Sequence, residues 1–219
     1  MLTTSPLKSA ARAMPRLCDT PGSELRLLVV STGPAHCVGI DLASGALVRA
    51  WSPVAVDRRL RPYDLVDVTV ANDPDVVPDP CEPEALAVAA APVLVGRMTG
   101  RGALRLARPL LHPDKAPLLG FHGPAVPFWE RRPDHPSVAL AKPKQPVVVT
   151  VEEGVMWCHF MWWGRPQVLE CRDPRLGAFL ARARKDAVAL ATGTLLLIAL
   201  EPPVQGQCHK VVEALVPRR

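Results

Sequence analysis

The residues best suited to chemistry stand together in one strip, WCHFMWWG, at positions 157–164. A cysteine and a histidine can act as nucleophile and base, or bind a metal ion. The three tryptophans could stack on nucleobases or pack in a core. Because the whole chain has only 5 Trp, the direction in which this strip faces decides among these chemistries.

The chain has two Cys–His dipeptides, Cys158–His159 and Cys208–His209. We do not expect either pair to form a site to which both of its side chains contribute. Adjacent residues on a β-strand point to opposite faces, so neither dipeptide can offer both side chains to one ligand. A metal-dependent hydrolase stays open as an alternative only if His159 and His209 meet across neighbouring strands beside a carboxylate, because a metal site needs three or four ligands. The six cysteines lack the spacing of a zinc knuckle. We therefore expect no catalytic residues, no metal and no cofactor.

As a strand, the strip divides into two faces. Cys158, Phe160 and Trp162 form a wholly apolar set, which predicts that they face the interior. Trp157, His159, Met161 and Trp163 form the other set, which includes a histidine and ends at a turn, so we expect it to be wetter. Two interpretations of the tryptophans stay open: packing against other elements, or an aromatic surface for stacking bases through Trp157 and Trp163.

Basic residues gather in one segment and recur in two later ones: Arg97, Arg101, Arg105, Arg108, Arg131, Arg132, Lys142 and Lys144. The first four lie in GRMTGRGALRLARP, with no acidic residue among them. Arginine forms bidentate contacts with phosphate and stacks on bases, so these residues are candidates for binding nucleic acid. Two glycines predict that the first part of the segment is flexible, and the segment lacks the GK[ST] of an ATP-binding loop. The alternative is an ordinary solvated face.

Composition permits nucleic-acid binding without requiring it. The formal net charge is +5 over 219 residues, and 48% of the residues are hydrophobic, which is typical of a chain with a real core. No apolar run approaches the roughly 18 residues of a membrane-spanning helix. The start of the chain has no continuous apolar run either. We therefore expect a cytoplasmic protein without a membrane partner.

Period-two alternation predicts strands along most of the chain. The segment 38–51 reads as a hairpin turning at Gly45, and 63–72 alternates cleanly. A long, proline-dense region from about 109 to 136 predicts a connection between two units. The second unit contains a hairpin around Gly164 and one clear helix starting at Asp173, an N-cap residue followed by proline.

The segments CVGIDLASGALVRAWSP, LRPYDLVDVTV, FMWWGRPQVLECRDP and LLLIALEPPVQGQCHKVVEALV occur in this order. In that order and spacing, from about residue 25 to the C-terminus, the chain resembles the dual OB-containing domain family, prokaryotic proteins with two tandem OB-like barrels. The sequence departs from the family pattern in ALEPP, which lacks a glycine after Leu200, and in its proline-rich connection. The resemblance implies nucleic-acid binding or sensing in a prokaryotic defence setting, and it carries over no catalytic residue.

Together these observations predict a mainly β protein with minor α content: two tandem OB-like β-barrels and one clear helix in the second. The expected divisions are a disordered tail at 1–23, a first domain at 24–112, a connection at 113–137 and a second domain at 138–219. The expected function is non-enzymatic binding or sensing of nucleic acid, with single-stranded DNA or RNA and a protein as candidate partners and the strandedness left open. The alternatives are a protein–protein interaction module without nucleic-acid binding, and the histidine-based hydrolase.

Overall fold

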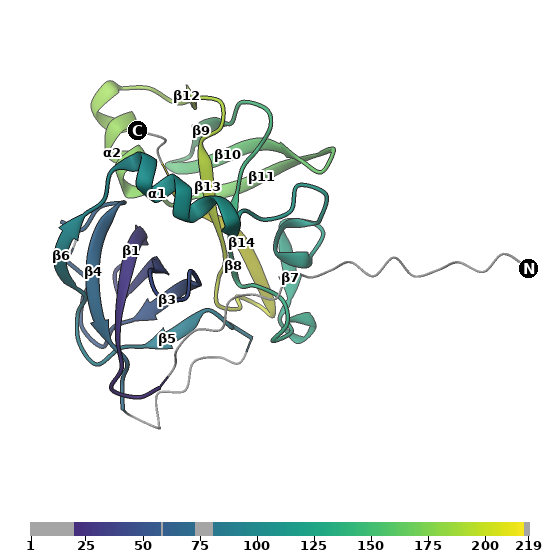
Figure 1. Cartoon of the computed structure of the whole chain (residues 1–219). Coiled ribbons are helices and arrows are strands. Elements are labelled where there is room, and N and C mark those ends of the chain that lie inside the picture. The colour runs from purple at the N-terminus through teal and green to yellow at the C-terminus, as the bar shows by residue number, and fades with distance from the viewer. Residues whose placement is uncertain (1–19, 58, 73–80, 217–219) are drawn as a thin grey trace, which may run out of the picture.

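A computed structural model describes residues 20–57, 59–72 and 81–216, and over these residues the protein is mainly β. Two sheets lie side by side, with helix α1 (Gly100–Ala107) across the front between them (Figure 1). The sequence prediction of a mainly β fold is therefore confirmed. No helix among the described residues is long and apolar enough to cross a membrane.

The first sheet has the strand order β5-β3-β2-β1-β4-β6. Its strands are β1 (Glu24–Thr32), β2 (His36–Asp41), β3 (Leu47–Trp51), β4 (Asp64–Thr69), β5 (Ala85–Ala87) and β6 (Val93–Arg97). The predicted hairpin is present as β2 and β3, which pair antiparallel and turn through Gly45 at φ 72°. A bridge between Val70 and Val88 also links the ends of β4 and β5.

The second sheet has the order β12-β9-β10-β11-β14-β13-β8. Its strands are β8 (Val138–Ala141), β9 (Val148–Glu152), β10 (Val155–Trp162), β11 (Arg165–Cys171), β12 (Ala187–Ala189), β13 (Leu195–Leu200) and β14 (Gln207–Val216). Within the expected connection, β7 (Ala125–Pro127) pairs with β14. Two 3-10 turns, Leu118–Gly120 and Phe128–Glu130, shape the rest of that region, and a third, Arg108–Leu110, precedes it directly after α1.

The two sheets repeat one pairing pattern. In each, three consecutive strands form an antiparallel meander, β1-β2-β3 and β9-β10-β11. The third strand of each meander then pairs in parallel with a later strand, β3 with β5 and β11 with β14. This repeat exists in the topology although the two halves share no obvious repeat in sequence.

The strip at positions 157–164 lies mostly on β10, and the two faces of this strand are buried and half-buried as predicted. Cys158, Phe160 and Trp162 are buried, with exposed fractions of 0%, 5% and 5%, whereas Trp157, His159 and Met161 are half-buried. The strand ends in a turn at Trp163 and Gly164, both with positive φ, a conformation that suits the glycine. The apolar face therefore belongs to the core of the second sheet.

Two α-helices occur in the described part of the chain, one expected and one not. Helix α2 (Pro174–Ala183) begins as predicted, because the side chain of Asp173 accepts hydrogen bonds from the backbone N–H groups of Arg175 and Leu176. The prediction that Gly100 and Gly102 make the first part of the arginine-rich segment a flexible loop is wrong, since both glycines lie in α1. Thr99 caps α1 by accepting from the N–H of Gly102 at 3.3 Å.

Three clusters of buried side chains make up the core. One belongs to the first sheet alone, and one belongs to the second sheet, α2 and the connection. The third, which we call the shared cluster, is formed by both sheets and by the buried side of α1. It includes Leu28 and Ile40 from the first sheet, Ala103 from α1, and Leu197 and Val211 from the second sheet. The sheets are therefore packed against each other through apolar contacts.

Candidate nucleic-acid interface

Helix α1 and the start of the 3-10 turn that follows it present three arginines on one face. Arg101, Arg105 and Arg108 follow each other at the four- and three-residue intervals that keep side chains on one side of a helix, and all three are exposed. Ala103 and Ala107, on the opposite side, are buried in the shared cluster. Within the described residues, none of the three arginines forms an ion pair with a carboxylate. We call this set the arginine stripe.

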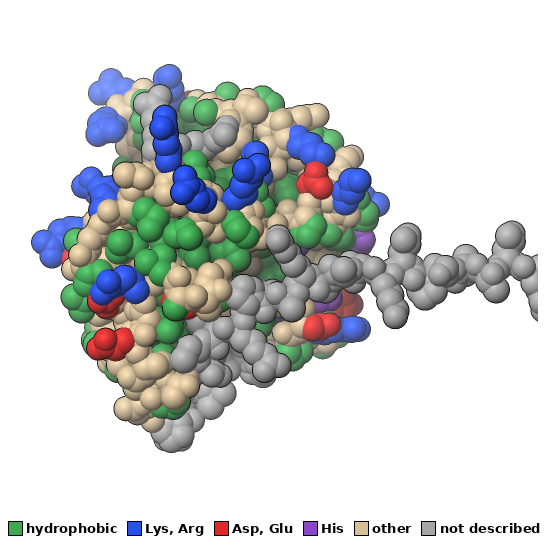
Figure 2. Space-filling view, in the orientation of Figure 1, with side chains coloured by type: hydrophobic (Ala, Val, Ile, Leu, Met, Phe, Trp, Pro, Cys, Tyr) green, Lys and Arg blue, Asp and Glu red, His purple; other side chains and the backbone are tan. Residues whose placement is uncertain are grey.

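The surface around the stripe is rich in positive charge. Figure 2 shows Lys and Arg side chains spread along the upper half of this face, over α1 and α2, with Asp and Glu mostly below. The C-terminal end of α2 adds Arg182, Arg184 and Lys185, all exposed. Arg97, the remaining arginine of the predicted segment, lies on β6 and contacts Asp64 at 3.6 Å.

An open cavity of about 580 Å³ lies beyond the C-terminal end of α1. We call it the lysine cleft, and it is lined by Leu111, His112, Asp114, Lys142, Pro143, Lys144, Thr192 and Gly193. Lys144 pairs with Asp114 at 2.7 Å. Burial lowers the pKa of His112, and its Nε2 lies 2.8 Å from the carbonyl oxygen of Pro117. The ring is therefore neutral at neutral pH, with Nε2 as the donor.

The outer face of β10 carries the second candidate surface. Trp157 lies between Thr150 on β9 and Glu170 on β11, its partners in the two ladders. Its neighbour His159 is engaged, because its Nε2 lies 2.9 Å from the hydroxyl of Thr150. Trp157 thus offers part of its ring to solvent from a regular strand, the setting in which aromatic side chains stack on bases.

Trp163 belongs to a different cluster, at the tip of the β10–β11 hairpin. Its exposed ring stacks on His122 with the ring centroids 5.3 Å apart, and the guanidinium of Arg165 lies 6.0 Å from its centroid. The loop that carries His122 is held by Lys210, whose Nζ donates to the carbonyl oxygens of Phe121 and Gly123. Burial lowers the pKa of Lys210 to about 8. The two predicted stacking residues, Trp157 and Trp163, therefore occupy separate surroundings.

The adjacent residues Arg131 and Arg132 of ERRPDHP also have different surroundings. Arg132 is exposed, but Arg131 is only 7% exposed. The Arg131 guanidinium donates to the carbonyl oxygen of Cys81 at 2.8 Å and lies 3.6 Å from Glu82. Arg131 therefore ties the connection to the first sheet and is not presented to a phosphate in this structure.

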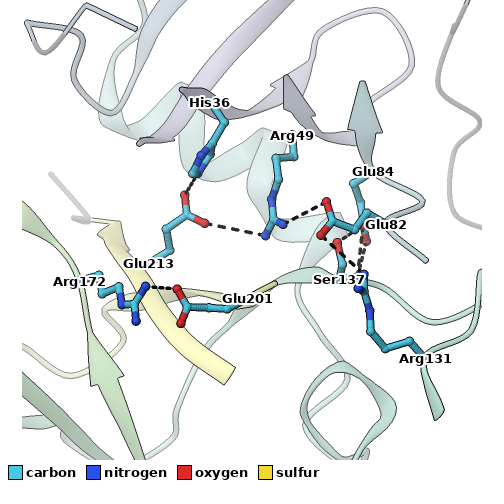
Figure 3. Close-up of polar contacts among 9 residues, drawn as sticks. All are labelled: His36, Arg49, Glu82, Glu84, Arg131, Ser137, Arg172, Glu201 and Glu213. Atoms are coloured by element: carbon cyan, nitrogen blue, oxygen red, sulfur yellow. Dashed lines mark hydrogen bonds and ion pairs between the residues drawn. The ribbon is translucent and has the colours of Figure 1, made fainter. Parts of the chain in front are cut away.

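Sequence reasoning did not find a buried network of charged groups between the sheets (Figure 3). Glu213 on β14 lies 3.0 Å from the His36 ring on β2 and 3.9 Å from Arg49 on β3. Arg49 reaches Glu82 at 3.5 Å, and Glu82 is the carboxylate that also contacts Arg131. These polar contacts link both sheets and the connection.

Glu84 is a second buried carboxylate of this network and is 1% exposed. It accepts hydrogen bonds from the backbone N–H of Ser137 at 3.1 Å and from its hydroxyl at 2.8 Å. Burial raises the pKa of Glu84 and outweighs these bonds and the charge of Arg49, which act to lower it. No sequence signal marked the network, because its members are scattered and each stands in an ordinary strand or loop.

The structure gives the hydrolase alternative no geometric support. Strand β11 lies between β10 and β14, so His159 and His209 are not on neighbouring strands. Among the described residues, no group of three or more His, Cys, Asp or Glu side chains could hold a metal ion. Burial raises the pKa of Cys37 to about 12 and that of Cys171 to about 11, and it also raises that of Cys158, so these thiols are protonated at neutral pH and are poor nucleophiles.

Comparison with known proteins found no matching family model, no matching curated protein and no matching solved structure. Its function therefore has to be inferred from the chemistry of its own surfaces. Of these, the arginine stripe and the lysine cleft are continuous along the chain, since Leu111 of the cleft follows Arg108 by three residues.

Proposed function

We propose that this protein binds nucleic acid without catalysing a reaction, and that its sheets are two OB-like barrels. The repeated pairing pattern supports the architecture, because a three-stranded meander joined to later strands is the plan of a five-stranded Greek-key barrel. The link between Val70 and Val88 joins the end of β4 to the end of β5, which supports partial closure of strands β1 to β5. OB folds commonly bind oligonucleotides, although fold alone does not establish function.

The observation that carries the proposal is the arginine stripe. Three exposed guanidinium groups lie on one helical face, and within the described residues no carboxylate neutralises them. A polyanion binds such a stripe by releasing its own condensed counterions. Arginine also presents paired N–H donors that fit a phosphate. The short, capped helix fixes the backbone spacing of these arginines, which a flexible loop would not.

Binding should be tested by fluorescence anisotropy with single-stranded DNA, single-stranded RNA and duplex DNA over a range of salt concentrations. Affinity should fall steeply with salt, with a log–log slope of about −0.7 per phosphate contact for a single strand. The double variant Arg101→Ala/Arg105→Ala should make the slope shallower by about one to two contacts. Its matched control is Arg26→Ala/Arg59→Ala, which removes two exposed arginines elsewhere that are paired with Asp67 and Asp57.

The results of these titrations distinguish binding at the arginine stripe from general electrostatic binding and from no binding. If the control double variant changes the slope as much as the stripe variant, general positive charge and not the stripe accounts for binding. If the wild-type protein binds none of the three probes at low salt, the nucleic-acid proposal is wrong. The resemblance to the dual OB family also suggests a role in prokaryotic defence, which neighbouring nuclease or helicase genes would support.

A protein-interaction module is the second candidate, and strand β6 favours it. Val93, Leu94 and Val95 are exposed in succession, by 61%, 57% and 45%. In the described part of the chain, β6 stands at the end of the sheet order, with β4 as its one neighbour. An apolar edge strand without charged side chains at its centre can pair with a strand of another protein. Partner binding that is insensitive to salt, with no retention on nucleic acid, would favour this candidate.

A further inference from the structure

The lysine cleft is large enough to hold a small-molecule ligand. Three segments that are distant in sequence form it: the residues after α1, the turn between β8 and β9, and the turn before β13. Its volume of about 580 Å³ lies within the range of about 300–1,000 Å³ that is usual for small-molecule sites. The cleft also lies close to the arginine stripe along the chain, because its lining residue Leu111 follows Arg108 by three residues.

The cleft combines a free cation with apolar walls. Lys142 is exposed and forms no ion pair with any described residue, whereas Lys144 is already neutralised by Asp114. Leu111 and Pro143 supply apolar surface. The neutral ring of His112 donates through Nε2 to Pro117, which leaves Nδ1 as an acceptor. A nucleotide presents a matching set: an anionic phosphate, a flat apolar base and polar base edges.

We propose that the lysine cleft holds one unstacked nucleotide of a single-stranded nucleic acid, with its phosphate at Lys142. This inference rests on the proposed function and adds that the bound nucleic acid is single-stranded. A base in a duplex is stacked and paired, so it cannot enter a concave site without leaving the helix. The arginine stripe holds any phosphate backbone, whereas the cleft accepts a base only from a single strand.

The test uses the full chain with an oligothymidylate, a duplex of the same length and free thymidine monophosphate. Thr192→Trp fills the cleft from an exposed position. It should weaken binding of the oligothymidylate by about fivefold to a hundredfold, the usual contribution of one stacked base, and leave duplex binding unchanged. Lys142→Ala should make the salt slope shallower by about one contact. The control Lys115→Ala removes an exposed lysine that does not line the cleft and should change neither quantity.

Three outcomes would overturn the inference. If Thr192→Trp and Lys142→Ala both bind the oligothymidylate like the wild type while the stripe variant is weakened, nucleic-acid binding stands and the cleft site is wrong. If free thymidine monophosphate binds the cleft as tightly as the strand does, the site serves a free nucleotide. If the wild type binds no nucleic acid, the proposed function fails first. Because Lys142→Ala only shortens an exposed side chain, it keeps the test valid should Thr192→Trp not fold.

Discussion

The imidazole of His36 on β2 and the carboxylate of Glu213 on β14 lie 3.0 Å apart, Nε2 to Oε1, across the boundary between the two sheets. The residues are 177 positions apart in sequence. Arg49 faces the same carboxylate at 3.9 Å. Glu213 is thus a charge of the second sheet that is stabilised by groups of the first, so its ionisation connects the packing of the sheets to pH.

Glu213→Gln should lower the free energy of unfolding by about 1.5–3 kcal/mol at neutral pH, the usual size of a hydrogen bond to a charged group. Burial acts to raise the pKa of Glu213, but His36, Arg49 and Ser31 together lower it below its ordinary value of 4.5. A carboxyl with a depressed folded pKa contributes stability above its unfolded pKa and loses it as pH falls through the folded pKa.

The cost of Glu213→Gln should therefore shrink as the pH falls below about 4.5. Urea unfolding of the wild type and the variant, from neutral to acidic pH, measures this difference. A cost that stays constant over the whole range would mean that the charge of Glu213 contributes nothing.

Glu84→Gln should behave in the opposite way. Burial raises the folded pKa of Glu84, so the stability linked to its protonation is present below the unfolded pKa and is lost as pH rises through the folded pKa. Glutamine keeps an oxygen acceptor for Ser137 without the buried charge. The variant should therefore be no less stable than the wild type at neutral pH, and its relative stability should increase from acidic to neutral pH. A clear loss of stability at neutral pH would contradict this.

Phe160→Ala should lower the free energy of unfolding by about 3–5 kcal/mol, the usual cost of removing a buried phenylalanine. Phe160 is 5% exposed and belongs to the core of the second sheet. Met161→Ala, on the opposite face of the same strand, should cost clearly less because Met161 is half-buried. Chemical denaturation of both variants decides the matter, and a cost below about 1 kcal/mol for Phe160→Ala would contradict the core assignment.

Trp157→Ala should weaken binding of a single strand while leaving the salt slope nearly unchanged, because stacking releases no counterions. Anisotropy titrations at several salt concentrations separate the two quantities. Trp163→Ala serves as the comparison, since Trp163 is already stacked on His122. If Trp157→Ala binds the single strand with unchanged affinity, the outer face of β10 is not part of the nucleic-acid interface.

Trypsin should cut the connection at Lys115, which is exposed. The two fragments should nevertheless remain together under native conditions, because both sheets contribute to the shared cluster. Size-exclusion chromatography of the digest, followed by denaturing electrophoresis, tests this directly. Fragments that elute separately would show that the units at 24–112 and 138–219 are independent domains.

The sequence allowed the local elements to be predicted where alternation or capping was strong. The strip on β10 and the N-cap of α2 at Asp173 are examples, since each depends on neighbours within a few residues. Helix α1 was missed because Gly100 and Gly102 have poor helix propensity. Its formation depends on the Thr99 cap and on Ala103, which is buried by both sheets, and the sequence alone does not show that contact.

The candidate site could be predicted only in part, for the same reason. The basic residues of 97–108 were visible in the sequence, but their alignment on one face depends on the helix. Arg131 and Arg132 are equivalent in sequence, yet Arg131 is buried against Glu82, which lies far away along the chain. The lysine cleft was not foreseeable, because three distant segments form it.

Strand β6 and helix α1 are joined by only two residues, Met98 and Thr99. The exposed apolar edge and the arginine stripe are therefore neighbours on one stretch of chain. A protein strand added to β6 would lie beside a nucleic acid held at α1. If the chain binds both a protein strand and a nucleic acid, the two ligands would therefore meet on adjoining elements, β6 and α1.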